Sequence, residues 1–187
     1  MRDEELIETT IASEPLCDGV LLKAHKDRVR LPNGGEAIRE WIQHPGAAVV
    51  IAMLDNGKLL FERQFRYSVR RIMLELPAGK IDAGEPALDT ARRELKEETG
   101  YKAKTWRHVG TMHPCIGYSD ERIEIFLAHG LSYVGNSLDE EEFLDVCEMT
   151  LADAIHAVRD GEITDAKTIT ALFWAEKLIS GEWQLPA

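Results

Sequence analysis

The chain has 187 residues, of which 22 are basic and 33 acidic, so its formal net charge at pH 7 is −11. A hydrophobic fraction of 44% beside 29% charged residues is typical of a soluble globular domain with a buried core, and it excludes a largely disordered chain. No run of about eighteen apolar residues occurs, which excludes a transmembrane helix, and the acidic charge argues against binding a nucleic-acid backbone by electrostatics alone.

The first 45 residues are predicted to form a β-rich extension. Short strands are expected over residues 20–26, 28–31 and 36–43, with a turn at Pro32-Asn33-Gly34-Gly35 between the last two. His44-Pro45-Gly46 then interrupts the pattern. We therefore expect an N-terminal extension over residues 1–45 and a main domain over residues 46–187.

The main domain is predicted to mix strands and helices. The apolar run 47–54 indicates a strand buried on both faces, and the turn at 55–57 leads into a paired strand at 58–63. Further strands are expected at 106–112, 122–129 and 146–149, and helices at 86–99, 151–159 and 165–179. Most strands precede the last two helices, which predicts the α+β class rather than a regular alternation of strand and helix.

An acidic cluster lies on the predicted helix 86–99. Glu94, Glu97 and Glu98 are spaced i, i+3 and i+4, so they share one helix face and repel one another unless a cation neutralises them. Clustered carboxylates suit Mg²⁺ or Mn²⁺, which commonly bridge protein and phosphate oxygens. Arg93 is placed to pair with Glu97 along the helix or with Glu85 in the preceding loop. The alternative is a solvated helix face with scattered Glu–Lys pairs.

This segment resembles the signature of the Nudix hydrolase family. That signature is Gly, five residues, Glu, seven residues, Arg-Glu, an aliphatic residue, one residue, Glu-Glu, one residue, Gly and an aliphatic residue. Every fixed position is matched, by Gly79, Glu85, Arg93, Glu94, Leu95, Glu97, Glu98 and Gly100, and only Tyr101 departs from the pattern. The resemblance implies a Nudix fold, in which helices enclose a mixed sheet, and hydrolysis of a nucleoside diphosphate linked to another group.

The resemblance also implies the residues of a metal site. Its ligands would be the carboxylates of Glu94, Glu97 and Glu98 and the carbonyl of Ala78, with Mg²⁺ as the expected cation and Mn²⁺ as the alternative. Glu98 and Arg93 would take part in catalysis. A second acidic run, 139–142, matches a loop that carries the catalytic base and a further ligand, which assigns Glu140 as the base and Glu142 as the ligand. The register within this run stays open by one residue.

Segments outside the signature resemble the branch of ADP-ribose and nucleoside diphosphate sugar pyrophosphatases. They are residues 44–47, 62–67, 74–79 and 161–168. This resemblance makes Arg66, Trp41, Glu75 and Lys80 the candidate substrate-binding residues and the extension a dimerisation element, so we predict a homodimer. Trp41 is alternatively an aromatic residue packed at an interface, and Arg66 an exposed strand charge.

The predicted function is Mg²⁺-dependent hydrolysis of the pyrophosphate bond of ADP-ribose or another nucleoside diphosphate sugar, giving a nucleoside monophosphate and a sugar phosphate. Two alternatives stay open: a Nudix hydrolase of dinucleoside polyphosphates or capped RNA, and a non-catalytic nucleotide-sugar sensor. The expected partner is a small nucleotide sugar, with no nucleic acid and no membrane. The acidic N-terminus resembles no signal or transit peptide, and three widely spaced cysteines suggest no disulfide framework, so we expect a cytoplasmic protein.

Overall fold

The computed structural model describes residues 2–135, 137–138 and 143–184. The described chain divides into two compact units. The first comprises residues 1–45 together with 115–121, and the second comprises residues 46–114 together with 122–187. Each unit is described by itself. No described helix is long and apolar enough to cross a membrane.

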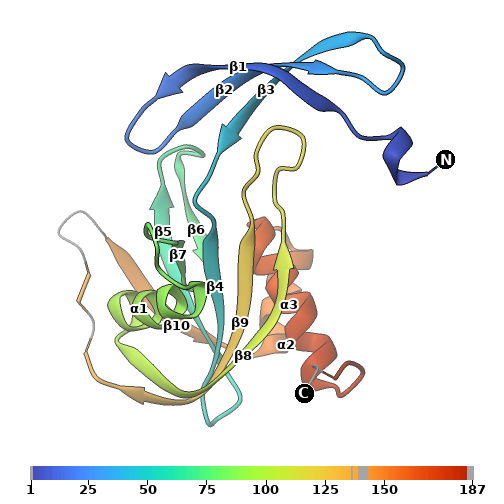
Figure 1. Cartoon of the computed structure of the whole chain (residues 1–187). Helices are drawn as coiled ribbons and strands as arrows, with labels where there is room; N and C mark the ends of the chain where they lie inside the picture. The colour runs from blue at the N-terminus through green and yellow to red at the C-terminus, as the bar shows by residue number, and fades with distance from the viewer. Residues whose placement is uncertain (1, 136, 139–142, 185–187) are drawn as a thin grey trace. The chain divides into compact units, whose positions relative to one another are not determined.

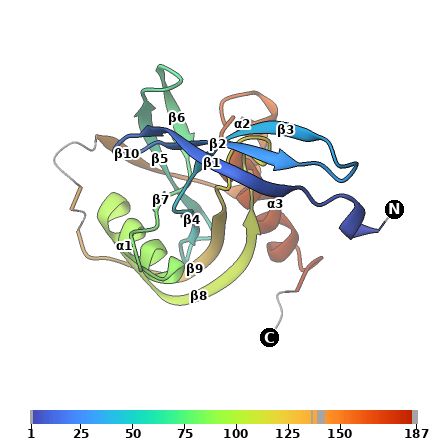
Figure 2. The same cartoon turned by 45° about the horizontal axis from the view of Figure 1, so that its top comes forward.

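The first unit is a three-stranded antiparallel sheet in the order β1-β2-β3 (Figures 1 and 2). A short 3-10 helix, Asp3–Glu5, precedes β1 (Thr9–Asp18), β2 (Lys23–Arg30) and β3 (Glu36–Gln43). The predicted strand 36–43 and the turn before it are confirmed, since the Leu31 amide donates to the Gly35 carbonyl at 2.8 Å. The two strands predicted over 20–31 are one continuous strand, β2, and β1 was not predicted.

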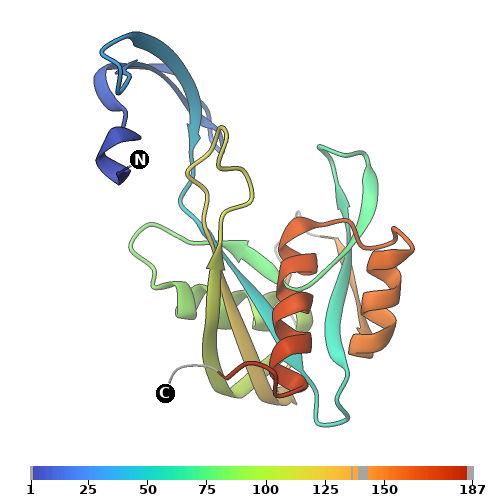
Figure 3. The ribbon, with the colours of Figure 1, turned by 90° about the vertical axis from the view of Figure 1, so that its right-hand side faces the viewer.

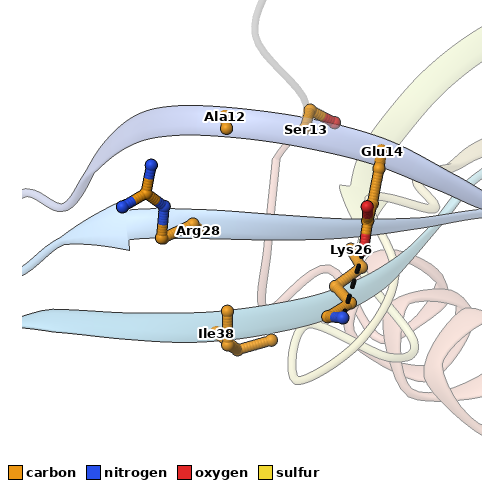
Figure 4. A pocket seen from close by; sticks show the side chains of 6 residues that line it. All are labelled: Ala12, Ser13, Glu14, Lys26, Arg28 and Ile38. Carbon is orange, nitrogen blue, oxygen red and sulfur yellow. Dashed lines mark ion pairs between the residues drawn. The ribbon is translucent and has the colours of Figure 1, made fainter.

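Residues 115–121 belong to this unit because they are hydrogen-bonded to the end of β3. The Ile42 amide donates to the Tyr118 carbonyl at 2.8 Å, and the His44 amide donates to Asp120 Oδ1 at 2.7 Å. One face of the sheet carries a shallow hollow of about 270 Å³, in which Lys26 pairs with Glu14 at 3.1 Å (Figure 4). It is lined by Ala12, Ser13, Glu14, Lys26, Arg28 and Ile38.

The second unit contains a mixed seven-stranded sheet. Its main order is β10-β5-β4-β9-β8, with β6 added beside β5 and β7 beside β4. The strands are β4 (Ala47–Met53), β5 (Leu59–Arg66), β6 (Arg71–Glu75), β7 (Ala78–Lys80), β8 (Tyr101–Met112), β9 (Ile123–Tyr133) and β10 (Leu144–Met149). The β4–β9 pair is parallel and the other pairs are antiparallel.

Helices cover both faces of this sheet (Figure 3). The alternating side chains of β4 divide between two hydrophobic clusters, with Val49 and Ile51 in one and Ala48 and Val50 in the other. The first cluster includes residues of α2 (Leu151–Arg159) and α3 (Ala166–Ile179), and the second includes residues of α1 (Ala87–Thr99). The predicted α+β class, with helices enclosing a mixed sheet, is confirmed, as are all three predicted helices.

Candidate active site

Two of the three clustered glutamates of α1 are buried against the sheet. Glu94 is 9% exposed and Glu98 is 3% exposed, while Glu97 is partly exposed. The helix ends at Gly100, which adopts the left-handed conformation at φ 77° and lets the chain turn directly into β8. A solvated charged face would not bury two carboxylates, so that alternative for the acidic cluster is wrong.

Arg93 is the cation that holds this cluster together. Its guanidinium donates to Glu85 at 3.1 and 3.2 Å, to Glu94 at 2.8 Å and to Glu97 at 3.2 Å. Both pairings expected for Arg93, with Glu97 and with Glu85, are therefore present. The hydrogen bonds from Arg93 outweigh the opposing effect of burial and lower the pKa of Glu85 to about 2, with help from the Thr90 hydroxyl at 2.7 Å.

The short strand β7 brings its backbone directly against the buried acids. The Ala78 amide donates to Glu98 Oε2 at 3.1 Å. A Cβ atom built on Gly79 would lie only 1.8 Å from Glu94 Oε1, so only glycine leaves room for that carboxylate. The first glycine of the signature is therefore required by a close approach between strand and helix, and the segment 78–79 contacts both Glu98 and Glu94.

A second charged group surrounds Glu75 at the end of β6. Arg66 donates to the two Glu75 oxygens at 2.7 and 2.9 Å, and Lys167 of α3 donates to Glu75 as well. Burial works to raise the pKa of Glu75, which is 2% exposed, but the hydrogen bonds from Arg66 and Lys167 lower it overall. Next to this group, the Leu76 amide donates to the Thr168 hydroxyl at 3.0 Å, which fixes the start of α3 to β6.

Glu62 of β5 is a buried acid that the sequence analysis did not single out. It has no exposed surface, and neither carboxylate oxygen makes a hydrogen bond of good geometry in the described part of the chain, where the Glu98 carboxyl is the neighbouring polar group. Burial, together with the charge of Glu75 opposite it in the strand pair, raises its pKa to about 8, and the Glu98 carboxyl lies near enough to act on its ionisation. One feature of the sequence could have pointed to Glu62: it is an acidic residue directly after the apolar residues 59–61 of a predicted strand.

The other predicted site residues lie in different places. Lys80 is exposed, and its carbonyl accepts from Arg93 at 3.3 Å. Trp41 belongs to the first unit, where its indole N–H donates to Asp27 at 3.0 Å and its ring stacks on His25 with centroids 4.9 Å apart. The predicted base Glu140 and ligand Glu142 lie outside the described residues.

The donor set fits a divalent cation of the Mg²⁺ type. Within the described ranges, no three His, Cys, Asp or Glu side chains stand together as a ready metal site, and the Arg93 guanidinium donates to both Glu94 and Glu97. The residues present nevertheless supply buried oxygen ligands, namely Glu94, Glu98 and the unpartnered oxygens of Glu62. Hard cations prefer such oxygens, and the glycine at position 79 lets the Glu94 carboxylate lie directly against the backbone.

Two family profiles match the chain. A profile described as the NUDIX domain matches residues 43–172. The chain belongs to the Nudix family. A profile described as the nucleoside diphosphate sugar hydrolase N-terminal domain matches residues 8–42, within the first unit. Nudix hydrolases generally need a divalent metal, which agrees with the chemistry of the acids around Gly79.

Relatives with assigned names cover nearly the whole of this Nudix protein. An ADP-ribose pyrophosphatase from Bacillus subtilis is 42% identical over 171 residues, which cover 90% of this chain and 92% of the relative. A methanol dehydrogenase activator from Bacillus methanolicus is 39% identical, with 88% and 90% covered. A solved structure of an ADP compounds hydrolase superposes with a TM-score of 0.83 over 95% of this chain and 97% of its own, at 22% identity, which supports the fold.

Proposed function

We propose that this protein is a pyrophosphatase that hydrolyses the pyrophosphate bond of ADP-ribose or another nucleoside diphosphate sugar. The products are a nucleoside monophosphate and a sugar phosphate. The observation that carries the proposal is the packing of Gly79 against Glu94, with Glu98 and Arg93 beside it, in a chain of the Nudix family. The name of the Bacillus subtilis relative and the match to a nucleotide-sugar hydrolase N-terminal domain support this substrate class.

We assign the metal ligands to Glu94, Glu97, Glu98 and the carbonyl of Ala78, with Mg²⁺ as the cation and Mn²⁺ as a substitute. When bound, the cation neutralises phosphate charge and activates the attacking water. The Ala78 amide orients Glu98, and Gly79 leaves the space that Glu94 fills. Arg93 positions Glu94 and Glu97 while Glu85 anchors Arg93, so we propose a positioning role for Arg93.

The substrate-binding residues are proposed from the same resemblance. Arg66 has a fixed orientation because both of its hydrogen bonds go to Glu75, and its charge suits a diphosphate. Lys80 is exposed beside the metal-binding backbone and is a second phosphate contact. Trp41 is proposed to stack on the base. We keep Glu140 as the base and Glu142 as an additional ligand.

The extension over residues 1–45 is proposed to be a dimerisation element, with residues 46–187 as the catalytic domain. Strand β1 is exposed along its whole length, and apolar side chains of this region are open to solvent, among them Ile11, Leu16 and Ile38. Long exposed strands with apolar side chains are unfavourable in isolation. A second copy of the chain that covers them gives a homodimer. We place the protein in the cytoplasm because its three cysteines carry free thiols.

A substrate panel tests the proposed function. The purified protein is incubated with Mg²⁺ and ADP-ribose, ADP-glucose, GDP-mannose, UDP-glucose, a diadenosine polyphosphate or a capped RNA oligomer, and release of nucleoside monophosphate is measured. We expect preferential cleavage of one sugar nucleotide and none in the presence of EDTA. Cleavage of only the polyphosphate or the cap would contradict the substrate class. Metal-dependent binding without cleavage of any compound would contradict the enzymatic activity.

A further inference from the structure

Buried oxygen atoms without a hydrogen-bond partner are concentrated on one strand. The described residues contain four such side-chain oxygens: Asp27 Oδ1, Glu62 Oε1, Glu62 Oε2 and Gln64 Oε1. Three of the four belong to Glu62 and Gln64, which are two residues apart on β5 and so lie on the same side of the sheet. Nearly all buried polar atoms in folded proteins have a partner, so this group requires a physical explanation.

The face that carries these oxygens is the face covered by α1. Leu60, two residues before Glu62, belongs to the hydrophobic cluster that includes Ala91 and Leu95 of that helix. Glu62 therefore points toward α1, in agreement with the effect of Glu98 on its ionisation. Glu98 is in turn held by the Ala78 amide. The unpartnered oxygens are thus directed toward the residues assigned to the metal.

The positively charged side chains nearby are already engaged. Arg66 gives its two hydrogen bonds to Glu75, and Lys167 donates to Glu75 and, at 3.0 Å, to Asp165. Neither makes a hydrogen bond to Glu62. Ionisation of a carboxyl group that is buried without a hydrogen bond is strongly unfavourable, and a cation placed against the carboxylate removes that cost.

We propose that Glu62, which lies outside the Nudix signature, is an additional carboxylate ligand of the divalent cation bound by Glu98. The amide oxygen of Gln64 lies on the same side of β5, two residues further along the strand. Two carboxylates, one from a strand and one from a helix, match the oxygen ligands that Mg²⁺ and Mn²⁺ prefer. The inference rests on the proposed divalent-metal chemistry of the site.

The test measures metal binding without substrate. Mn²⁺ is titrated into wild-type protein, Glu62→Gln and the matched control Glu148→Gln, and free Mn²⁺ is followed by electron paramagnetic resonance. The control makes the same substitution at an exposed residue of β10, the strand beside β5. We expect Glu62→Gln to weaken Mn²⁺ binding by about 10- to 100-fold, the range found when a supporting group of a metal site is removed, and Glu148→Gln to bind as wild type does.

A second readout is the rise in Tm that saturating Mg²⁺ produces. A ligand that binds only the folded state stabilises that state, and the stabilisation grows with the logarithm of the ratio of ligand concentration to Kd. At the same Mg²⁺ concentration we therefore expect a smaller rise in Tm for Glu62→Gln than for wild type. If Glu62→Gln does not fold, Glu62→Leu places an apolar side chain at this buried position and serves in both measurements.

If the folded Glu62 variants bind Mn²⁺ with the affinity and stoichiometry of wild type, the inference is overturned. Glu62 would then be a buried acid that keeps its own proton. That result would leave the proposed function intact. Wild-type protein that binds no Mn²⁺ at all would overturn the inference and the proposed metal-dependent function together.

Discussion

The contact between Gly79 and Glu94 predicts the effect of adding a single methyl group. A Cβ at position 79 would lie 1.8 Å from Glu94 Oε1 and 2.0 Å from its carboxyl carbon, whereas real Cβ contacts essentially never fall below 3.0 Å. In Gly79→Ala the carboxylate must therefore move by about 1.2 Å or more. A misplacement of about 1 Å in a catalytic group can reduce a rate by about 100-fold, so we expect turnover to fall by about that factor.

The loss of stability in Gly79→Ala should be moderate by comparison. The crowded atoms are the end of a flexible side chain, so the helix itself need not shift, and overpacking of this kind costs about 1–3 kcal/mol. Turnover of ADP-ribose with Mg²⁺ and the Tm are measured for Gly79→Ala and for Gly19→Ala. At Gly19 the added Cβ meets its nearest neighbour at an ordinary 3.4 Å, so this control should retain wild-type values. Turnover of Gly79→Ala within twofold of wild type would refute the steric argument.

Three further predictions concern two acids of the site and the oligomeric state. Glu98→Gln should fold normally yet lose at least about 100-fold in turnover, because a buried charge assigned to the metal is removed; near-normal turnover would disprove the assignment. The pKa of Glu85 is about 2 in the folded protein and higher in the unfolded chain, so its contribution to stability is full above about pH 4.5 and is lost as the pH falls toward 2. Arg93→Met should flatten that part of the curve of unfolding free energy against pH, and an unchanged curve would contradict the role of Arg93. Sedimentation at micromolar concentration should show a homodimer, and a monomer would remove the dimerisation role of residues 1–45.

The elements that sequence reasoning located well are those whose local sequence carries a clear pattern, such as a helix cap, an apolar run or a helical spacing. Helix α2 was predicted over its full length because Thr150 caps it, and the Thr150 hydroxyl accepts from the Asp153 amide at 3.1 Å. Strand β4 was found from its continuous apolar run, which both hydrophobic clusters bury. The acidic face of α1 was found from residue spacing alone, since the i, i+3 and i+4 positions of a helix always lie together.

The elements that were missed have no local sequence pattern that announces them. Strand β1 is exposed throughout and so has no apolar alternation to detect. The break expected in β2 came from Asp27, but that acid is buried in the strand because it accepts the Trp41 indole N–H. Strand β7 has three residues and exists because it pairs with β4, and the burial of Glu62 likewise follows from the packing of α1 over β5.

The attachment of α3 to β6 has a consequence for the order in which the protein matures during synthesis. The Leu76 amide finds its acceptor in Thr168, and Glu75 receives one of its two cations from Lys167, both about half the chain later. Chains emerge from the ribosome N-terminus first, so the strands and α1 are available well before these partners. Until Lys167 has been synthesised, Glu75 has only Arg66 as a hydrogen-bonded cation. The charged group around Glu75 is therefore completed in the second half of translation, after the strand that carries this acid.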